Sequence, residues 1–271
     1  MGYVCVLTGS LCYLISEILA KRYLGDCSIL EIALVRFAFG APLIFVSHSR
    51  LTVRACYFAC VNLLNSLAGL GSILYGTMQS FAIASQTRPL FIGLSAALLF
   101  QEQMSRRTTM VLFVCAGLSI AVVYTGAALF SLWTYLFIAT ILLQAISFAM
   151  VGQTGTSASV WSLLALYNLL GFWVCLVVGE LTSSIILERL LTHAPALGGS
   201  AAFGLAGSVL VLVGMKEGGK AKNSVAYYVR LPLTILVGVF LFAEPVNPIT
   251  LTLVAAIVGL LCLNGLDNNR R

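Results

Sequence analysis

The chain has 271 residues, of which 60% are hydrophobic and 9% are charged, and its mean hydropathy is +1.03. Since an ordinary soluble domain carries about 25% charged residues, this composition excludes a soluble globular fold. A membrane-spanning helix needs about 20 apolar residues, so the length accommodates about ten spans joined by short connections. The apolar runs lack the strict alternation of barrel strands, which predicts an all-α integral membrane fold.

The hydropathy pattern predicts ten transmembrane helices in chain order. The first run lacks the preceding basic region and the cleavage site of a signal peptide, so we expect it to be retained. The predicted spans cover residues 3–20, 29–47, 55–76, 80–100, 108–125, 132–151, 160–179, 197–215, 223–242 and 249–266.

The basic residues predict the orientation of these spans, because cytoplasmic connections of membrane proteins carry an excess of Lys and Arg. With the N-terminus inside, nine basic residues fall on the cytoplasmic side and three on the other. The nine are Arg50, Arg54, Arg106, Arg107, Lys216, Lys220, Lys222, Arg270 and Arg271, and the three are Lys21, Arg22 and Arg189. We therefore expect both termini to be cytoplasmic, and the short connections favour a bacterial inner membrane. The net charge of +6 then reflects orientation, and no nucleic-acid partner is expected.

The two halves of the chain contain residues that match at fixed shifts. A shift of 142 residues places Arg88 on Arg230, Phe100 on Phe242, Glu102 on Glu244, Thr108 on Thr250 and Gly117 on Gly259. A shift of 131 residues places Ser16 on Ser147, Ser28 on Ser159 and Gly40 on Gly171. Five spans per half is an odd number, so two five-helix repeats, residues 1–127 and 128–271, would have opposite orientations. Inverted repeats with a binding site near the midplane are typical of secondary transporters.

Two segments also carry a resemblance to a known family. They run from Pro89-Leu90-Phe91 through Phe100-Gln101-Glu102 to Gly117, and from Pro232 through Phe242-Ala243-Glu244-Pro245 to Gly259. Both resemble the EamA-type repeat of the drug/metabolite transporter superfamily, although the family's usual glycine before the Glu is Gln101 in one half and Ala243 in the other.

The resemblance implies a ten-helix transporter that works by alternating access without ATP. It implies organic metabolites, including amino acids, as substrates. The segment Lys21-Arg22-Tyr23-Leu24-Gly25 together with Arg36 is similar to bacterial members that import S-adenosylmethionine.

Three ionisable residues inside the predicted spans are the leading candidates for substrate binding. A charge in the bilayer core costs about 2.5–3.5 kcal/mol on the insertion scale, so each requires a partner, a cavity or an interface. At about 1.5 Å per residue, Glu17 lies roughly 21 Å above the inner face, Arg88 roughly 18–19 Å and Arg230 about 10–11 Å. The two arginines thus straddle the midplane, and a guanidinium binds a carboxylate or phosphate with two parallel hydrogen bonds.

The alternative for these arginines is a structural role, in which backbone carbonyls and Gln86 satisfy them. Three roles are open to Glu17, which can neutralise Arg36, carry a coupling proton through a raised pKa, or accept a substrate amine.

Gln86, Asn62 and Tyr227 complete the predicted substrate-binding set. Gln86 lies beside Arg88, and Asn62 shares a helix face with Asn65 three residues later. A tyrosine ring such as that of Tyr227 can stack on a flat organic substrate, although Tyr and Trp also anchor helices at the membrane interface.

Five further residues are assigned structural or gating roles. We expect Arg36 to form a structural ion pair with the acid of the first span, or to snorkel, in preference to binding substrate. Glu102 and Glu244 end their spans at opposite faces, and we favour a charge that stops the span over a gate contact or a cap on a neighbouring helix N-terminus. Pro89 and Pro232 each remove a backbone hydrogen bond beside an arginine, which exposes carbonyls where a site would use them.

Residue patterns for catalysis or cofactor binding are missing from the sequence. It contains no His-based metal motif, phosphate loop or dinucleotide fingerprint, and its eight cysteines form no Cys-x-x-Cys. We therefore expect no enzyme activity, no cofactor and no metal site. The predicted function is secondary transport of a small anionic or zwitterionic metabolite, with membrane lipid as the other partner and a homodimer compatible with the sequence. The alternative is a non-transporting scaffold or a lipid-binding protein.

Overall fold

The computed structural model describes residues 1–46, 53–85, 87–101, 106–126, 131–150, 159–217, 223, 225–245, 248–249, 251–253, 255–257 and 259–260. Within these ranges the chain forms helices and no strand. The elements are α1 (Gly2–Tyr23), α2 (Ile29–Gly40), η1 (Ala41–Val46), α3 (Val53–Tyr75), α4 (Met78–Ser85), α5 (Thr87–Phe100), α6 (Arg106–Gly126), α7 (Leu132–Met150), α8 (Val160–Leu181), α9 (Leu187–Thr192), α10 (Ala194–Lys216), η3 (Val225–Val229) and α12 (Arg230–Phe242).

Seven segments of the described chain are long and apolar enough to cross a membrane. They are Gly2–Tyr23, Val53–Tyr75, Met78–Leu99, Leu132–Met150, Val160–Leu181, Ala194–Lys216 and Val225–Phe242. Each overlaps one of the spans predicted from hydropathy. The all-helical class is therefore confirmed, and the apolar segments fit an integral membrane protein.

The other three predicted spans are not among these seven. The second corresponds to the 12-residue α2 followed by the 3₁₀ helix η1; Pro42 lies at this change and lacks the N–H that an α-helix would use. The fifth coincides with α6, whose apolar part runs from Thr109 to Leu118. The tenth, residues 249–266, extends beyond the described residues.

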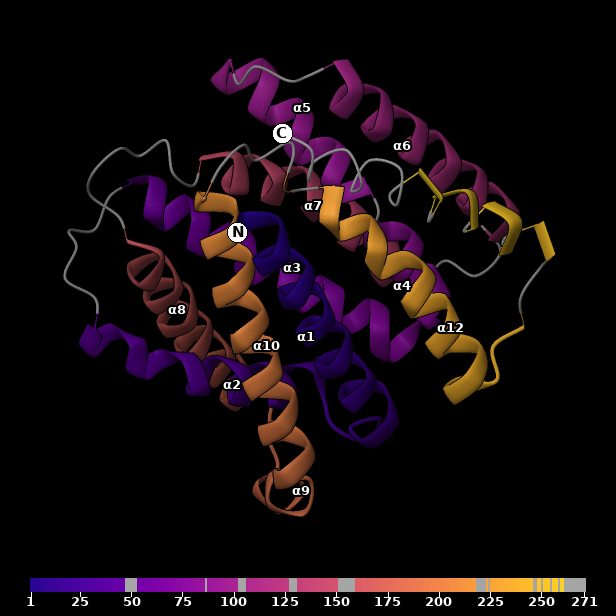
Figure 1. Ribbon diagram of the computed structural model, residues 1–271. Coiled ribbons are helices and arrows are strands. Elements are labelled where there is room, and N and C mark those ends of the chain that lie inside the picture. Colours follow the sequence, from indigo (N-terminus) through magenta and orange to yellow (C-terminus); the bar gives the residue numbers. More distant parts are fainter. Residues whose placement is uncertain are drawn as a thin grey trace.

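The helices α1 and α10 pack side by side through glycines (Figure 1). A Cβ added at Gly9 would lie 2.9 Å from the carbonyl oxygen of Gly207, and a Cβ added at Gly207 would lie 2.9 Å from that of Gly9. Such close backbone approach is how small residues pack helices in membranes. This contact joins the first long helix of the chain to one from its second half.

The helices α2 and α8 begin and pack in the same way. Ser28 and Ser159 are their N-caps, and each hydroxyl accepts a hydrogen bond of 3.1 Å from the backbone N–H three residues later. Gly40 packs against the side chain of Asn168, while Gly171 packs against the ring of Phe37. Each residue of the first contact is 131 positions from its counterpart in the second, so the two contacts are reciprocal.

One segment changes its helical geometry near an arginine, because η3 gives way to α12 at Arg230. Pro232 is the third residue of α12 and lies within the apolar segment Val225–Phe242. Pro89 lies within the apolar segment Met78–Leu99, beside Arg88. Both prolines therefore lie inside segments long enough to cross a membrane.

α5 and α12 are followed by residues in the left-handed conformation. Gln101 has φ of 52° and Ala243 has φ of 50°, and the two residues are 142 positions apart. The backbone N–H of Glu244 donates to the carbonyl of Gly238 at 3.0 Å, which closes the end of α12. This conformation favours glycine, whereas Gln101 and Ala243 both carry a Cβ.

Candidate functional site

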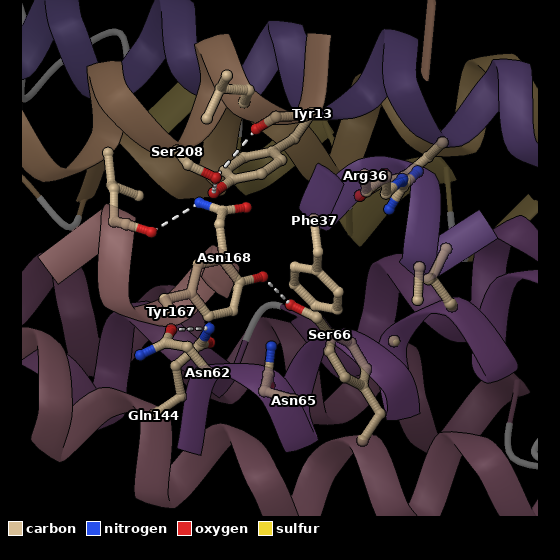
Figure 2. Close-up of a pocket in the computed structure, with 18 of the residues that line it drawn as sticks. Tyr13, Arg36, Phe37, Asn62, Asn65, Ser66, Gln144, Tyr167, Asn168 and Ser208 are labelled. Atoms are coloured by element: carbon tan, nitrogen blue, oxygen red, sulfur yellow. Dashed lines mark hydrogen bonds between the residues drawn. The ribbon is translucent and has the colours of Figure 1, made fainter. Parts of the chain in front are cut away.

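A cavity of about 120 Å³ lies between α1, α2, α3, α4, α5, α7, α8, α10 and α12 (Figure 2). This volume holds on the order of ten water molecules. On α3 the lining residues form one stripe from Phe58 to Ile73, which extends about 22 Å along the helix. The cavity is therefore elongated and is bounded by both halves of the chain.

Glu17 and Arg230 form a buried ion pair at this cavity. Their side chains are 8% and 4% exposed, and both residues line the cavity. The prediction that Arg36 pairs with Glu17 is therefore wrong. Arg230 reaches Glu17 from its lower predicted level through the length of its side chain, together with the greater rise of η3, about 2 Å per residue.

Arg36 is held by hydroxyl and carbonyl groups instead. Its Nη2 donates to the hydroxyls of Ser16 and Ser200, each at 2.9 Å, and its Nε donates to Ser200 at 3.2 Å. Ser16 also donates to the backbone carbonyl of Ser200 at 2.6 Å. This network ties α2 to α1 and α10, although Arg36 also lines the cavity (Figure 2).

Arg88 is buried at the cavity without a carboxylate partner in the described part of the chain. The residue is 7% exposed, and its Nε atom has no hydrogen-bond partner. The guanidinium carbon lies 5.8 Å from the ring centroids of Phe137 and Tyr227. Tyr227 is buried but does not line the cavity. It therefore contacts Arg88 on the side that faces away from the cavity.

Two stacked rings lie between the arginines. Phe81 and Phe137 stack with centroids 4.9 Å apart and an interplanar angle of 16°. Arg230 lies over Phe81 at 5.2 Å, as Arg88 lies over Phe137. Cation–π contacts of this kind stabilise a desolvated guanidinium without neutralising its charge, so the positive charge of Arg88 remains available to an anion.

A group of buried amides forms another wall of the cavity. Asn62, predicted as a site residue, donates its Nδ2 hydrogens to the carbonyl of Phe58 at 2.8 Å and to the hydroxyl of Ser147 at 3.0 Å. Gln144 donates to Oδ1 of Asn62 at 2.8 Å (Figure 2), and its own Oε1 is buried without a partner.

Several lining residues were not predicted from the sequence. They are polar groups of α3, α7, α8 and α10, namely Ser66, Gln144, Asn168 and Ser208. Gln144 and Asn168 are the only amide side chains within predicted spans six and seven. A single amide in an otherwise apolar helix is the sequence feature that could have identified them as lining residues. Ser66 and Tyr167 share a hydrogen bond of 2.6 Å, and Tyr13 and Ser208 share one of 2.8 Å.

Glu244 binds the N-terminus of α4. Its carboxylate accepts from the backbone N–H groups of Met78 at 2.8 Å and Gln79 at 3.1 Å, and it forms an ion pair of 2.9 Å with Lys21. Lys21 also donates to the carbonyl of Gly76 at 3.0 Å. The favoured interpretation, a charge that only stops its span, is therefore wrong for Glu244, which caps a neighbouring helix. Glu102 and Gln86 lie outside the described residues.

The charges of the lining favour an anion. Arg36, Arg88 and Arg230 are its basic residues and Glu17 is its acid, so two positive charges are not matched within the lining. Among the described residues no group of three or more His, Cys, Asp or Glu side chains could hold a metal ion.

Comparison with known proteins identifies the fold and no family. No family model matches the chain, and no curated protein does. Twenty-eight chains of solved structures match, and one, described only as "Crystal structure of protein", has a TM-score of 0.70 and 14% identity over 97% of each chain. At this identity the similarity shows that the two chains share a fold.

Proposed function

We propose that the chain is a secondary transporter that moves a small anionic or zwitterionic metabolite by alternating access. The observation that carries this proposal is Arg88, a buried guanidinium without a carboxylate partner in the described part, at a cavity lined by both halves of the chain. A buried charge without a partner is costly, so a protein that keeps one at a cavity gains from an anionic ligand that neutralises it.

The proposed architecture is ten helices in two inverted repeats, residues 1–127 and 128–271. Supporting observations are the matched N-caps Ser28 and Ser159, the reciprocal contacts of α2 with α8, and the left-handed residues Gln101 and Ala243. A change of helical geometry at the site, here from η3 to α12, fits transporters with inverted repeats, which use discontinuous helices there.

The ion pair supports a zwitterionic substrate as well as a simple anion. Oε2 of Glu17 is buried without a partner, and it can accept a hydrogen bond from a substrate ammonium. An amino acid or an S-adenosylmethionine-like metabolite carries both groups. The proposed setting is a bacterial inner membrane with both termini cytoplasmic, in agreement with the distribution of basic residues.

Uptake into proteoliposomes tests this proposal. We expect labelled amino acids or nucleoside-like metabolites to enter vesicles that contain the protein, and Arg88→Met to reduce uptake by about 100-fold, as expected for loss of a desolvated charge pair. Ser66→Ala, which alters the cavity without changing its charge, is the matched control. If correctly oriented protein moves none of the panel and Arg88→Met changes no ligand-induced thermal shift, the scaffold or lipid-binding alternative is supported.

A further inference from the structure

We propose that Gln144 selects substrates that carry an uncharged N–H donor at the end opposite the anionic group. Such a donor would belong to an amide, a ureido group or a heteroaromatic ring. This inference rests on the proposed function, because it takes the anion to lie beside Arg88.

The orientation of the Gln144 amide follows from an anchored chain of hydrogen bonds. The backbone carbonyl of Phe58 can only accept, so the Asn62 group 2.8 Å away must be its NH₂. Oδ1 of Asn62 therefore faces Gln144, which must present its own NH₂ there, at 2.8 Å. The atom left over is the Gln144 oxygen, an acceptor that is buried without a partner in the described part of the chain.

The position of Gln144 relative to Arg88 follows from α7. Phe137, which lies under the Arg88 guanidinium at 5.8 Å, is seven residues before Gln144. Seven residues are almost two full turns, so both side chains share one helix face about 10.5 Å apart along the axis. Both residues line the cavity, so the ring beneath Arg88 and the hydrogen-bond acceptor of Gln144 lie about two turns of α7 apart.

The surroundings of Gln144 favour a neutral donor over an ammonium group. The hydrogen bond of its side chain goes to Asn62, and Phe58 and Phe148 pack against each other with centroids 6.1 Å apart at the same end of the lining. The acid of the lining, Glu17, is engaged by Arg230. A cation at Gln144 would thus remain unneutralised, whereas a neutral N–H would satisfy the free oxygen.

The test compares ligands that differ only in their N–H groups. Purified protein in detergent is titrated with monoamides, monomethyl esters and mono-dimethylamides of straight-chain dicarboxylic acids of increasing length, with binding followed by thermal shift. All three keep the anion and a distal carbonyl, but only the monoamide has N–H donors. We expect at least one chain length at which the monoamide binds about tenfold more tightly than the other two, the factor expected for one net hydrogen bond at a buried acceptor.

Variants then assign this preference to Gln144. Gln144→Met removes the acceptor and should bring the affinity ratio of amide to ester to about one, with ester binding unchanged, whereas Ser66→Ala should keep the ratio. Equal binding of amide and ester by the unaltered protein at every length overturns the inference and leaves the transporter proposal in place, whether or not Gln144→Met folds. Failure of every anion to bind overturns the proposed function and this inference with it.

Discussion

Single residues of the cavity differ in how their charge is compensated, even when the sequence makes them look equivalent. Arg230 forms a buried ion pair with Glu17, while Arg88 has aromatic neighbours and no acidic partner in the described residues. Breaking a buried pair leaves a charge without its partner, whereas removing an unpaired buried charge relieves a desolvation penalty. Removal of Arg230 should therefore destabilise the fold, whereas removal of Arg88 should not.

We expect Arg230→Met to lower the free energy of unfolding by about 3–5 kcal/mol, and Arg88→Met to leave it unchanged or raise it. Thermal unfolding in detergent measures both. The double variant Glu17→Gln with Arg230→Met should recover part of the loss, because neither charge then remains buried alone. Equal destabilisation by the two single arginine variants would contradict the assignment of Arg88 as the free charge.

At the scale of single elements, the residue that follows a helix affects the stability of its end. Ala243 follows α12 in a left-handed conformation with φ of 50°, which costs a residue with a Cβ about 1–2 kcal/mol. We therefore expect Ala243→Gly to raise the free energy of unfolding by about 1 kcal/mol. Ala202→Gly, an exposed position within α10, should lower it by about 1 kcal/mol. Chemical denaturation distinguishes them, and a loss of stability in Ala243→Gly would contradict the conformation.

The contact between α2 and α8 predicts how much extra side-chain volume a helix face can accommodate. A Cβ at Gly171 would lie 2.6 Å from the Phe37 ring, while a Cβ at Gly117 in α6 meets nothing within 4 Å. Gly171→Ala should therefore cost about 1–3 kcal/mol through overpacking. Gly117→Ala should be neutral or stabilising by up to about 1 kcal/mol, because alanine favours the helix. Similar unfolding midpoints for the two variants would show that α2 and α8 are less tightly packed.

Hydropathy was sufficient to predict the seven apolar segments, because burial in lipid requires long apolar runs whatever their neighbours are. It could not predict the change from 3₁₀ to α-helix at Arg230 or the reach of this arginine's side chain, so depth counted along the backbone did not reveal its contact with Glu17. Lining residues such as Gln144 were missed because a single amide in an apolar helix does not reveal which way its side chain faces. The direction of the side chain depends on its hydrogen-bond partner in the folded protein, here Asn62 on α3.

The molecule as a whole is joined at one end of the cavity by the contact of Lys21 in α1 with Glu244 after α12. Glu244 also holds the N-terminus of α4, so three segments meet there. If the two halves move relative to each other during transport, this junction must open, because it links residues from both.

A reversible cross-link tests that motion. In a background without the native cysteines, Lys21→Cys and Glu244→Cys joined by a reducible bifunctional thiol reagent should block uptake into proteoliposomes, and a reductant should restore it. Each single cysteine treated in the same way provides the control. Full uptake by the cross-linked protein would show that this end stays closed throughout transport.

The ion pair between Glu17 and Arg230 has a further consequence during biosynthesis. Its two residues are 213 positions apart, and a ribosome that adds about 5–20 residues per second needs roughly 10–40 s to cover that distance. For this interval α1 has neither the cation that neutralises its acid nor the glycine-lined face of α10. The newly made first helix must therefore be sheltered from lipid by the insertion machinery until the second half of the chain arrives.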